Sequence, residues 1–532
     1  MAATLADAEG EGHDGRDSFR ISDLICDHDD DDLISFVLCC CPLPTVTTAA
    51  TLADAEGEGR DGRDRTNDLT DDLLRQVVSH LPIRDAVRTT TLSTRWRHIW
   101  HSAPLVLFDQ HISAATEAQH VAAISSILAS HTGPRIRTAH LTGFNFHDRK
   151  PELAQWARIL AEKDVEDLVL ITRPRVGFGN ALITSTFGYP GLDLPADILL
   201  RCKKLRRLYL GYWAFPKITN LPGGVGVFPD LEELAILNTY TKDNDLDHML
   251  ASCPALKKLA LVLNYLKPEH VRLRGKELEC AIVCSSVADV ALEAKCLKRL
   301  IMWDMWAPDL AIRIAGDVPA LKVLGYLDAG CHQLQFGGVQ VQAGTNASPM
   351  RRVPSVKILA IRVDFSEFRQ VQKLPSFLGC FPNIEILHVE SSASYELRKN
   401  YAKFFEELGP IECLLFHITK VFLYDFRGHQ SDMEFLKYLV SRASQMQKLT
   451  LVLPFEDLKH SVDENKIKVL LGELLLEPEW ATETCKVLLL RPVAELVCFF
   501  HRAFDLSIED PFLKDDGEEL FSSMKRREQD VN

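Results

Sequence analysis

The residue types that could do catalytic chemistry are common in this chain, but they are not arranged for it. Its 532 residues include 18 His and 14 Cys residues. We find no nucleophile–base set, no HExxH helix, no glycine-rich phosphate loop and no Cys–His set with the spacing of a zinc site. The sequence therefore offers no positive reason to propose an enzyme, and it predicts neither a cofactor nor a metal.

The chemistry that the sequence does offer is apolar binding, which is concentrated in residues 66–105. Four apolar residues follow the i, i+3, i+4, i+7 spacing of a helical stripe: Leu74, Val77, Val78 and Leu81. Trp96 and Trp100 are four residues apart, so they share a face of a second helix. Large apolar and aromatic side chains on one face are typical of a contact with another surface.

Three short helices are needed to position these side chains. Thr70 can cap the first helix, Asp85 the second and Ser93 the third, while Pro82 ends the first. A unit of about 40 residues buries little surface by itself. It must therefore either pack on the rest of the chain or dock on a partner.

This stretch resembles an F-box, the motif that joins a substrate receptor to the Skp-type adaptor of a cullin-based ubiquitin ligase. The matching residues are Asp68-Leu69, Asp72-Leu73-Leu74, Leu81-Pro82, Asp85-Ala86-Val87, Leu92-Ser93, Arg95-Trp96-Arg97 and Trp100. Thr70 stands where the family usually has proline. The resemblance implies that ten residues contact the adaptor: Leu69, Leu73, Leu74, Val77, Leu81, Pro82, Val87, Leu92, Trp96 and Trp100.

A different pattern, Leu-x-x-Leu-x-Leu with aliphatic substitutes, follows the F-box-like stretch. Its clear copies begin at Val165, Leu205, Leu231, Leu256, Leu297, Leu321, Val356 and Ile384, and weaker copies begin at Ile136 and Leu278. Each copy predicts a short strand that cannot bury its own face, whereas a stack of them can. We expect an irregular leucine-rich-repeat solenoid with parallel strands and helical or irregular returns; an ordinary α/β domain with unrelated strands is the alternative.

The repeat pattern continues past residue 405 in a distinct form. A strand with Ile418, Val421 and Leu423 is followed by a helix with a Ser431–Glu434 capping box, and two more strands are expected at Met446/Leu449/Leu451 and Cys485/Leu488/Leu490. The segment from Cys413 to Leu453 resembles the FBD region of plant F-box proteins with leucine-rich repeats. The resemblance implies one or two further repeats that close the solenoid, without catalytic chemistry.

The N-terminal segment is acidic and duplicated. Residues 1–64 hold 16 Asp and Glu residues against 4 Lys and Arg residues, whereas the whole chain has a net charge of −14. Residues 2–17 match residues 49–64 at fifteen of sixteen positions, and Asp31-Asp32-Leu33-Ile34 repeats the start of the F-box-like helix. We expect a degenerate partial F-box that is disordered or weakly helical.

These patterns predict an α/β chain with five parts. They are a disordered segment (1–64), the F-box (65–108), the solenoid (130–405), the FBD region (406–455) and an extension with a loose tail (456–532). The target protein, whose identity the sequence does not reveal, is expected on the repeats. The candidate contacts are Tyr209, Tyr212, Trp213, Trp303, Trp306 and His388.

The partners follow from the resemblance and the charge distribution. We expect a Skp-type adaptor, a cullin through it, and a target protein. No basic surface or apolar span favours nucleic acid or a membrane, and scattered cysteines favour the cytoplasm or nucleus. Two alternatives are a repeat scaffold that is no longer coupled to a ligase, and a small-molecule receptor or enzyme with a pocket in the repeats.

Overall fold

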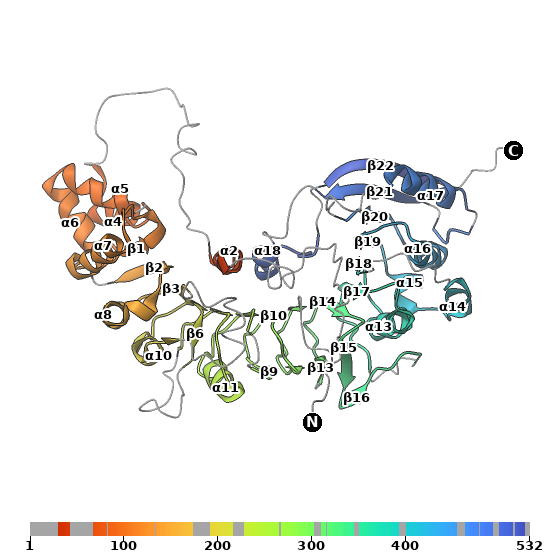
Figure 1. Ribbon diagram of the computed structural model, residues 1–532, viewed down its shortest axis with the longest axis horizontal. Coiled ribbons are helices and arrows are strands. Elements are labelled where there is room, and N and C mark those ends of the chain that lie inside the picture. Colours follow the sequence, from red (N-terminus) through yellow and green to blue (C-terminus); the bar gives the residue numbers. More distant parts are fainter. Residues whose placement is uncertain are drawn as a thin grey trace, which may run out of the picture.

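The computed structural model describes most of the chain outside the N-terminal segment. The described residues are 30–42, 68–81, 83–133, 135–173, 192–215, 228–264, 268–302, 310–314, 316–344, 351–392, 401–454, 463–477, 479–482, 484–492, 499–513 and 517–526. Figure 1 shows that the strands follow an arc, with the F-box-like helices at one end and the last strands at the other.

Three helices form the small N-terminal unit, as the sequence predicts. They are α4 (Asp71–Val78), α5 (Ile83–Arg88), which continues as the 3-10 helix η2 (Thr89–Thr91), and α6 (Thr94–Ser102). The Thr70 hydroxyl accepts the Leu73 amide, and the Ser93 hydroxyl accepts the Trp96 amide. Each hydroxyl therefore caps a helix by accepting a hydrogen bond from a backbone amide of its first turn. The expected cap at Asp85 is wrong, because α5 already begins at Ile83 and Asp85 lies in its first turn.

One long sheet runs through the rest of the chain. Its strand order is β1-β2-β3-β5-β7-β8-β10-β12-β14-β17-β18-β19-β20-β21-β22, and every neighbouring pair is parallel except β21 with β22. The strands are β1 (Leu105–Phe108), β2 (Ile136–Phe144), β3 (Asp167–Thr172), β5 (Arg207–Gly211), β7 (Glu233–Leu237), β8 (Lys258–Val262), β10 (Cys280–Cys284), β12 (Arg299–Met302), β14 (Val323–Asp328), β17 (Ile358–Val363), β18 (Ile386–Ser391), β19 (Lys420–Tyr424), β20 (Lys448–Val452), β21 (Thr484–Pro492) and β22 (Gly517–Arg526).

The leucine template is the inner face of this sheet. Leu168, Leu208, Leu234 and Leu259 pair in register along four neighbouring strands, and all are fully buried in one continuous core. Because side chains alternate along a strand, the residues next to them point to the other face. The predicted α/β fold, a helical F-box unit followed by a solenoid of parallel strands, is confirmed.

The return segments differ along the arc. Helices return the chain near both ends: α7 (Glu117–Ser130), α8 (Lys150–Glu162), α10 (Ala196–Arg201), α11 (Asp243–Ala251), α12 (Phe368–Val371), α13 (Leu374–Cys380), α14 (Ala402–Glu407), α15 (Glu412–Phe416), α16 (Gln430–Arg442) and α17 (Glu464–Leu476). In the middle, a second sheet of β16 (Val339–Gln340), β15 (His332–Phe336), β13 (Leu310–Ile314), β11 (Asp289–Leu292) and β9 (His270–Leu273) replaces them. These strand returns are not among the helical or irregular ones that we expected. A short pair, β4 (Leu192–Asp193) with β6 (Trp213–Ala214), completes the strands.

Several local predictions are wrong in register. Tyr326 leaves the inner face, because the pairing of β14 with β17 shifts between Leu324 and Leu327 and places Leu327 opposite Ile361. In β21, Val487 pairs with Leu449 and Leu489 with Leu451, so they occupy the template positions that we had assigned to Leu488 and Leu490. The helix α16 begins after His429, whose amide donates to Asp432, rather than at the predicted Ser431–Glu434 box.

One terminal segment differs from the expectation of a loose tail, whereas the degenerate N-terminal copy takes the helical one of its two expected forms. The residues of β22, which we expected to be loose, pair with β21 along its whole length. Asp30–Cys39 of the degenerate copy forms the helix α2, in which Val37 is buried, and Cys40, the residue that follows the helix, is buried as well. Figure 1 shows α2 inside the arc beside α18 (Phe499–Phe504), so two segments that are far apart in the sequence lie side by side in its hollow.

Arg299 fastens α18 to the sheet. Its Nη1 donates to the carbonyl oxygens of Arg502, Ala503 and Asp505 at 3.2, 2.8 and 2.9 Å, and its Nη2 bonds to the Ile508 carbonyl. Burial lowers the pKa of this guanidinium from its ordinary value. A buried cation thus satisfies carbonyl groups at a helix C-terminus, where the helix dipole also favours positive charge.

No helix within the described residues is both long enough and apolar enough to cross a membrane.

Replacing Arg299 by Met should destabilise the solenoid, because it leaves the carbonyl groups at the end of α18 without their donor. We expect the free energy of unfolding to fall by about 3 kcal/mol, since hydrogen bonds to a charged group contribute about 1.5–3 kcal/mol. Urea unfolding followed by circular dichroism would measure it.

The neighbouring Lys298 provides the matched control. Its side chain is exposed and pairs with Glu279 at 2.9 Å, and surface pairs contribute about 0–1 kcal/mol. Equal losses for Lys298→Met and Arg299→Met would contradict the role of Arg299 as a fastener.

Candidate functional site

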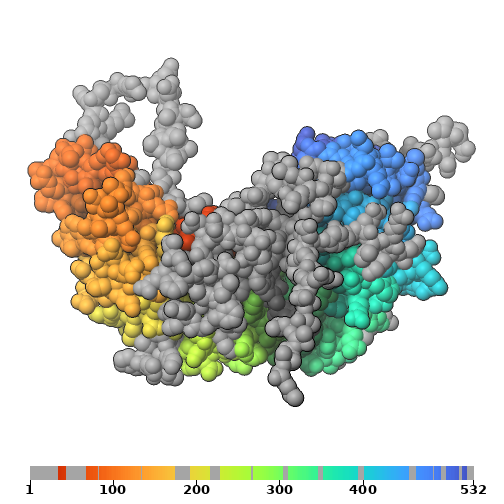
Figure 2. Space-filling model, viewed as in Figure 1, coloured from red at the N-terminus to blue at the C-terminus, as the bar shows by residue number. Residues whose placement is uncertain are grey.

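The F-box-like unit leaves five large apolar side chains open to solvent. The exposed fractions are 36% for Leu69, 47% for Leu73, 47% for Val77, 41% for Val87 and 65% for Leu92. We call these five residues the open apolar set. In the space-filling view the unit forms a lobe at one end of the arc (Figure 2). Large apolar side chains that a small folded unit leaves exposed are candidates for contact with a protein partner.

The open apolar set is held by polar contacts between helices. Leu73 and Val77 are four residues apart on α4, so they lie on one helical face. Arg95 of α6 donates to Asp71 at 2.9 Å and also bonds to the Leu69 carbonyl. This contact fixes the segment before α4 against α6, and with it the position of Leu69.

The predicted adaptor residues divide into two groups. Five form the open apolar set, whereas Leu74 is 1% exposed and packs with Val78, Ala86, Ile99 and Ala103. Leu81, Trp96 and Trp100 are partly buried against the same core, and Pro82 lies outside the described residues. The predicted stripe is thus split, because Leu74 and Val78 face inward while Val77 faces outward.

The two tryptophans also pack against the core of the protein. Trp100 meets His131 edge to face at 5.9 Å between ring centres and packs on the solenoid core as well as on the F-box core. It therefore joins the two parts of the chain. Trp96 keeps part of its surface open, so it remains a predicted contact at the edge of the site.

The predicted target-binding residues are mostly covered. Tyr209, Trp213 and His388 are 3%, 1% and 0% exposed, so the expectation that they form an open surface is wrong. Tyr212 is half-buried, and Trp303 and Trp306 lie outside the described residues. Trp213 is a core residue whose Nε1 donates to the Leu170 carbonyl at 2.8 Å.

His388 is covered because the C-terminal segment lies across it. Its ring stacks on Phe422 with 4.7 Å between centres, its Nδ1 lies 3.1 Å from the Tyr424 hydroxyl, and its Nε2 lies 3.1 Å from Asp510. Tyr424 in turn donates to the Phe512 carbonyl at 3.0 Å. The alternation of the strands correctly put His388 on the face away from the core, but nothing in that alternation indicated the segment above it.

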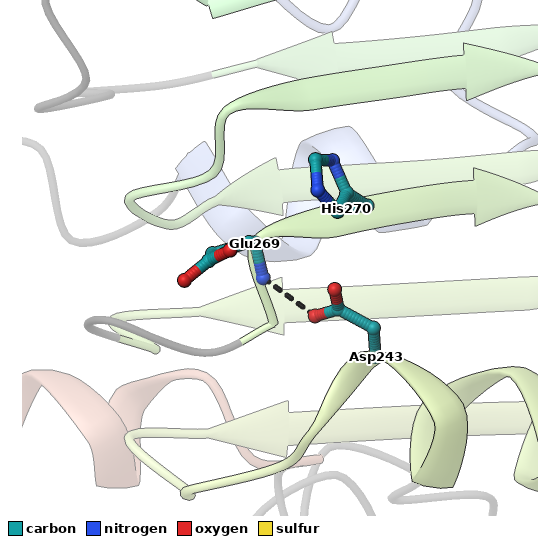
Figure 3. Close-up of side chains that lie close together, drawn as sticks. All are labelled: Asp243, Glu269 and His270. Carbon is teal, nitrogen blue, oxygen red and sulfur yellow. Dashed lines mark hydrogen bonds between the residues drawn. The ribbon is translucent and has the colours of Figure 1, made fainter.

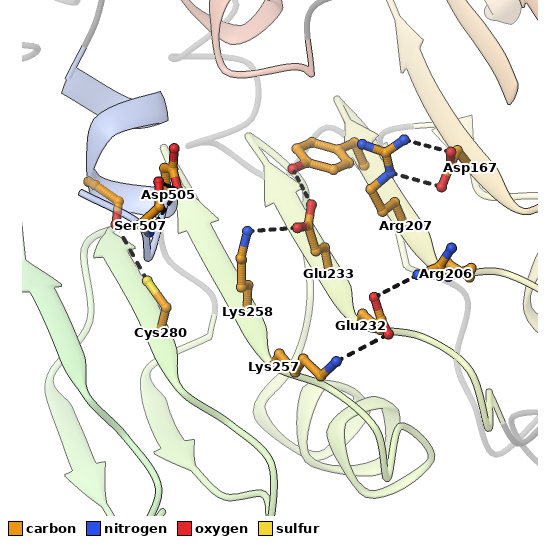
Figure 4. Close-up of polar contacts among 12 residues, drawn as sticks. Asp167, Arg206, Arg207, Glu232, Glu233, Lys257, Lys258, Cys280, Asp505 and Ser507 are labelled. Carbon is orange, nitrogen blue, oxygen red and sulfur yellow. Dashed lines mark hydrogen bonds and ion pairs between the residues drawn. The ribbon is translucent and has the colours of Figure 1, made fainter. Parts of the chain in front are cut away.

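A ladder of charges crosses the strands at their N-terminal ends (Figure 4). Arg206 pairs with Glu232 at 3.1 Å, and Glu232 with Lys257 at 3.2 Å. One residue further along, Arg207 makes two bonds to Asp167, while Lys258 and Tyr209 both donate to Glu233. This ladder was not among the expectations, although its signal is in the sequence: the two variable positions that follow Leu205, Leu231 and Leu256 carry charges of alternating sign.

One group of metal-ligand types comes together on the surface (Figure 3). Asp243, Glu269 and His270 each place a ligand atom within 4.8 Å of the others. One Asp243 oxygen already accepts the Glu269 amide at 2.7 Å, and His270 Nδ1 bonds to Asp289. The first bond joins α11 to the segment that leads into the edge strand β9, and the second joins β9 to β11, so both account for the cluster structurally. Asp243 and Glu269 are 26 residues apart in the sequence, a spacing that matches no metal-binding motif.

Comparison with known proteins gives the same three parts in the same order. A profile of the F-box domain matches residues 67–108, one for the leucine-rich repeats of the FBD-associated F-box protein At5g56370 matches residues 153–389, and one for the FBD matches residues 406–451.

Proteins named for these parts are also similar to the chain. Among them are two proteins of Arabidopsis thaliana named F-box/FBD/LRR-repeat protein, At1g13570 and At2g04230. They are 22% and 23% identical, over 75% and 79% of this chain and 93% and 96% of theirs. An F-box/LRR-repeat protein of the same plant, At3g26922, is 27% identical over 49% of this chain and 74% of its own.

The two sides of α4 should respond differently to truncation. Leu74→Ala leaves a cavity in the F-box core and should cost about 2–5 kcal/mol of local stability, whereas Leu73→Ala should change it by less than about 0.5 kcal/mol. Hydrogen exchange of the amides in α4 and α6 would measure both. Equal losses of protection would contradict the assignment of Leu73 to an open surface.

Proposed function

We propose, for a chain that belongs to the F-box/FBD/LRR-repeat family of plant proteins, that it is the substrate receptor of an SCF-type ubiquitin ligase. Members of this family are non-catalytic adaptor proteins. In the proposed assembly the F-box binds a Skp-type adaptor, the adaptor binds a cullin, and the repeats hold a target protein. Other subunits transfer the ubiquitin.

The observation that carries the proposal is the open apolar set. Five large apolar side chains remain exposed on a unit whose own core is already filled by Leu74, Val78 and Ile99. Burying side chains of this kind against a partner removes apolar surface from water and so favours association. The exposed Arg84 and Arg97 lie on α5 and α6, and they suit an acidic partner.

The receptor contributes proximity. Binding the target and the ligase at once replaces a bimolecular encounter by a held pair, and this accounts for the ubiquitin transfer without a catalytic residue on the receptor. The arrangement of the chain supports this role, since the F-box lies at one end of the arc and the FBD strands β19 and β20 lie toward the other (Figure 1). The repeats that would hold a target therefore lie between the two.

The rival proposal is a repeat scaffold that is no longer coupled to a ligase. Its motive was Thr70, which stands in place of the usual proline. The Thr70 hydroxyl accepts the Leu73 amide, so α4 begins with a capped N-terminus in spite of the substitution. This favours the coupled receptor. Co-purification of the adaptor and the cullin with the full chain would separate the two, because the scaffold should retain neither.

We place the protein in the cytoplasm or the nucleus, where the adaptor and the cullin work. The described cysteines are free, and most are buried. Burial raises the pKa of the Cys280 thiol to about 12, which keeps it protonated and inert. Reduced thiols of this kind suit those compartments.

Adding charge to the open apolar set should abolish capture of the adaptor. We expect the double variant Leu73→Asp/Val77→Asp to bind a purified Skp-type adaptor more than about tenfold more weakly, because loss of an interface anchor costs at least about 2 kcal/mol. Both side chains are half exposed in the free protein, so the fold should tolerate the change. Isothermal titration would measure the affinity.

The matched control is Val469→Asp on α17. Val469 is 60% exposed but lies outside the F-box, so its replacement should leave the adaptor affinity unchanged. If the double variant still bound the adaptor like the wild type, the F-box would not be the docking surface.

A further inference from the structure

A second apolar cluster fills the hollow of the arc. Strand residues that alternate with the leucine template form its floor: Val169, Tyr209, Ala235, Ala260, Ile282, Ile301 and Ala360. All of these are less than 5% exposed. We call this surface the concave floor. Its coverage comes from outside the repeats, since α2 and the segment that begins with α18 complete the cluster.

Polar contacts hold the C-terminal cover, which is the segment that begins with α18, on the concave floor. Arg299 holds four carbonyl groups at and after the end of α18, the Cys280 thiol lies 3.5 Å from the Ala503 carbonyl, and Lys258 sits over the Phe504 ring at 5.3 Å. His388 and Tyr424 hold the residues that follow. Buried and directional bonds of this number make this cover part of the fold.

The N-terminal cover is held differently. The parts of α2 and its end that enter the cluster are the apolar side chains Val37, Cys40 and Cys41, with Phe36 and Leu38 partly buried beside them. Burial raises the pKa of the Cys40 thiol, with a smaller contribution from Cys284 of the floor, and that of Tyr209 with a contribution from Cys41. The two covers therefore differ in the kind of contact they make. Polar contacts hold the C-terminal cover, whereas α2 and its end contribute an apolar face of about one helical turn.

The origin of α2 explains what face it presents. Its sequence repeats the first F-box helix, so that Val37 corresponds to Val77 and Pro42 to Pro82. Val77 is 47% exposed in the open apolar set, whereas Val37 is fully buried against the concave floor. The same helical position that the F-box leaves free for a partner is satisfied within the chain in its copy. The concave floor thus accepts the last turn of a short helix and the residues just after it, with small apolar side chains at Val37, Cys40 and Cys41.

We propose that the concave floor beside α18 is the binding site for a helical segment of the target, and that α2 occupies it in cis until such a helix displaces it. The inference rests on the proposed function, because it assumes that the repeats hold the target. Covalent attachment raises the local concentration of α2 at the floor. Only a target helix that binds more tightly than α2 would then be accepted.

The test uses a peptide of residues 28–43, labelled at its N-terminus and kept reduced, as the probe. The receptor is the full chain with Val37→Asp and Cys40→Asp, which places charge on two of the three buried side chains by which α2 and its end contact the floor. The matched control is Ser35→Asp, because Ser35 is on the same helix and exposed. We expect the double variant to bind the peptide at least about tenfold more tightly than the wild type or the control does in fluorescence anisotropy, because the competing helix is released.

A second receptor guards against a folding defect. A chain that begins at residue 43 lacks α2 but introduces no buried charge, and it should bind the peptide like the double variant. Equal affinity of the peptide for all four receptors, or no binding to the two that lack the α2 contact, would overturn the proposal. Binding of the adaptor is measured on the same samples. If the wild-type chain did not bind the adaptor, the proposed function would be contradicted, whereas the peptide result would be unaffected.

Discussion

A ladder of parallel strands that is apolar on both faces has to be covered on both sides, and the rest of this structure depends on that constraint. One face carries the leucine template and is covered by the return segments. The other carries Tyr209, Ala235 and Ala260, which are buried as deeply as the leucines. A leucine-rich-repeat solenoid with a polar concave face needs no such cover. Here the chain supplies it from both of its ends, and this brings α2 beside α18, more than 450 residues away in sequence.

The two apolar surfaces of the molecule therefore differ in whether the chain itself covers them. On the F-box the core is complete without Leu73 or Val77, so their exposure is a property of the finished fold and is left for a partner. On the concave floor exposure is avoided, and the chain's own helices take the place that a partner would have. In the proposed function the first surface binds the adaptor and the second selects the target.

Short-range patterns in the sequence were enough for much of this. The hydroxyl caps at Thr70 and Ser93 and the inward leucines of β3, β5, β7 and β8 follow from spacing within one turn or one strand. Spacing cannot reveal contacts between residues about 200 positions apart, such as that of Arg299 with the end of α18. This contact places α18 over the concave floor. The floor residues were therefore assigned to the correct face of the sheet, but they are covered and not open. The F-box stripe was misassigned for a related reason. Leu74 and Val77 have the same apolar character, and only the packing of α6 on α4 decides which of them faces inward.

The central claim is that the F-box end of the chain, and not the repeats, meets the adaptor. Hydrogen–deuterium exchange of the full chain with and without a purified Skp-type adaptor tests it most directly. The account predicts new protection in residues 69–78 and 83–97, with the amides of β5, β7, β8 and β10 unchanged. Protection confined to the repeat strands, or no change anywhere on addition of the adaptor, would contradict it.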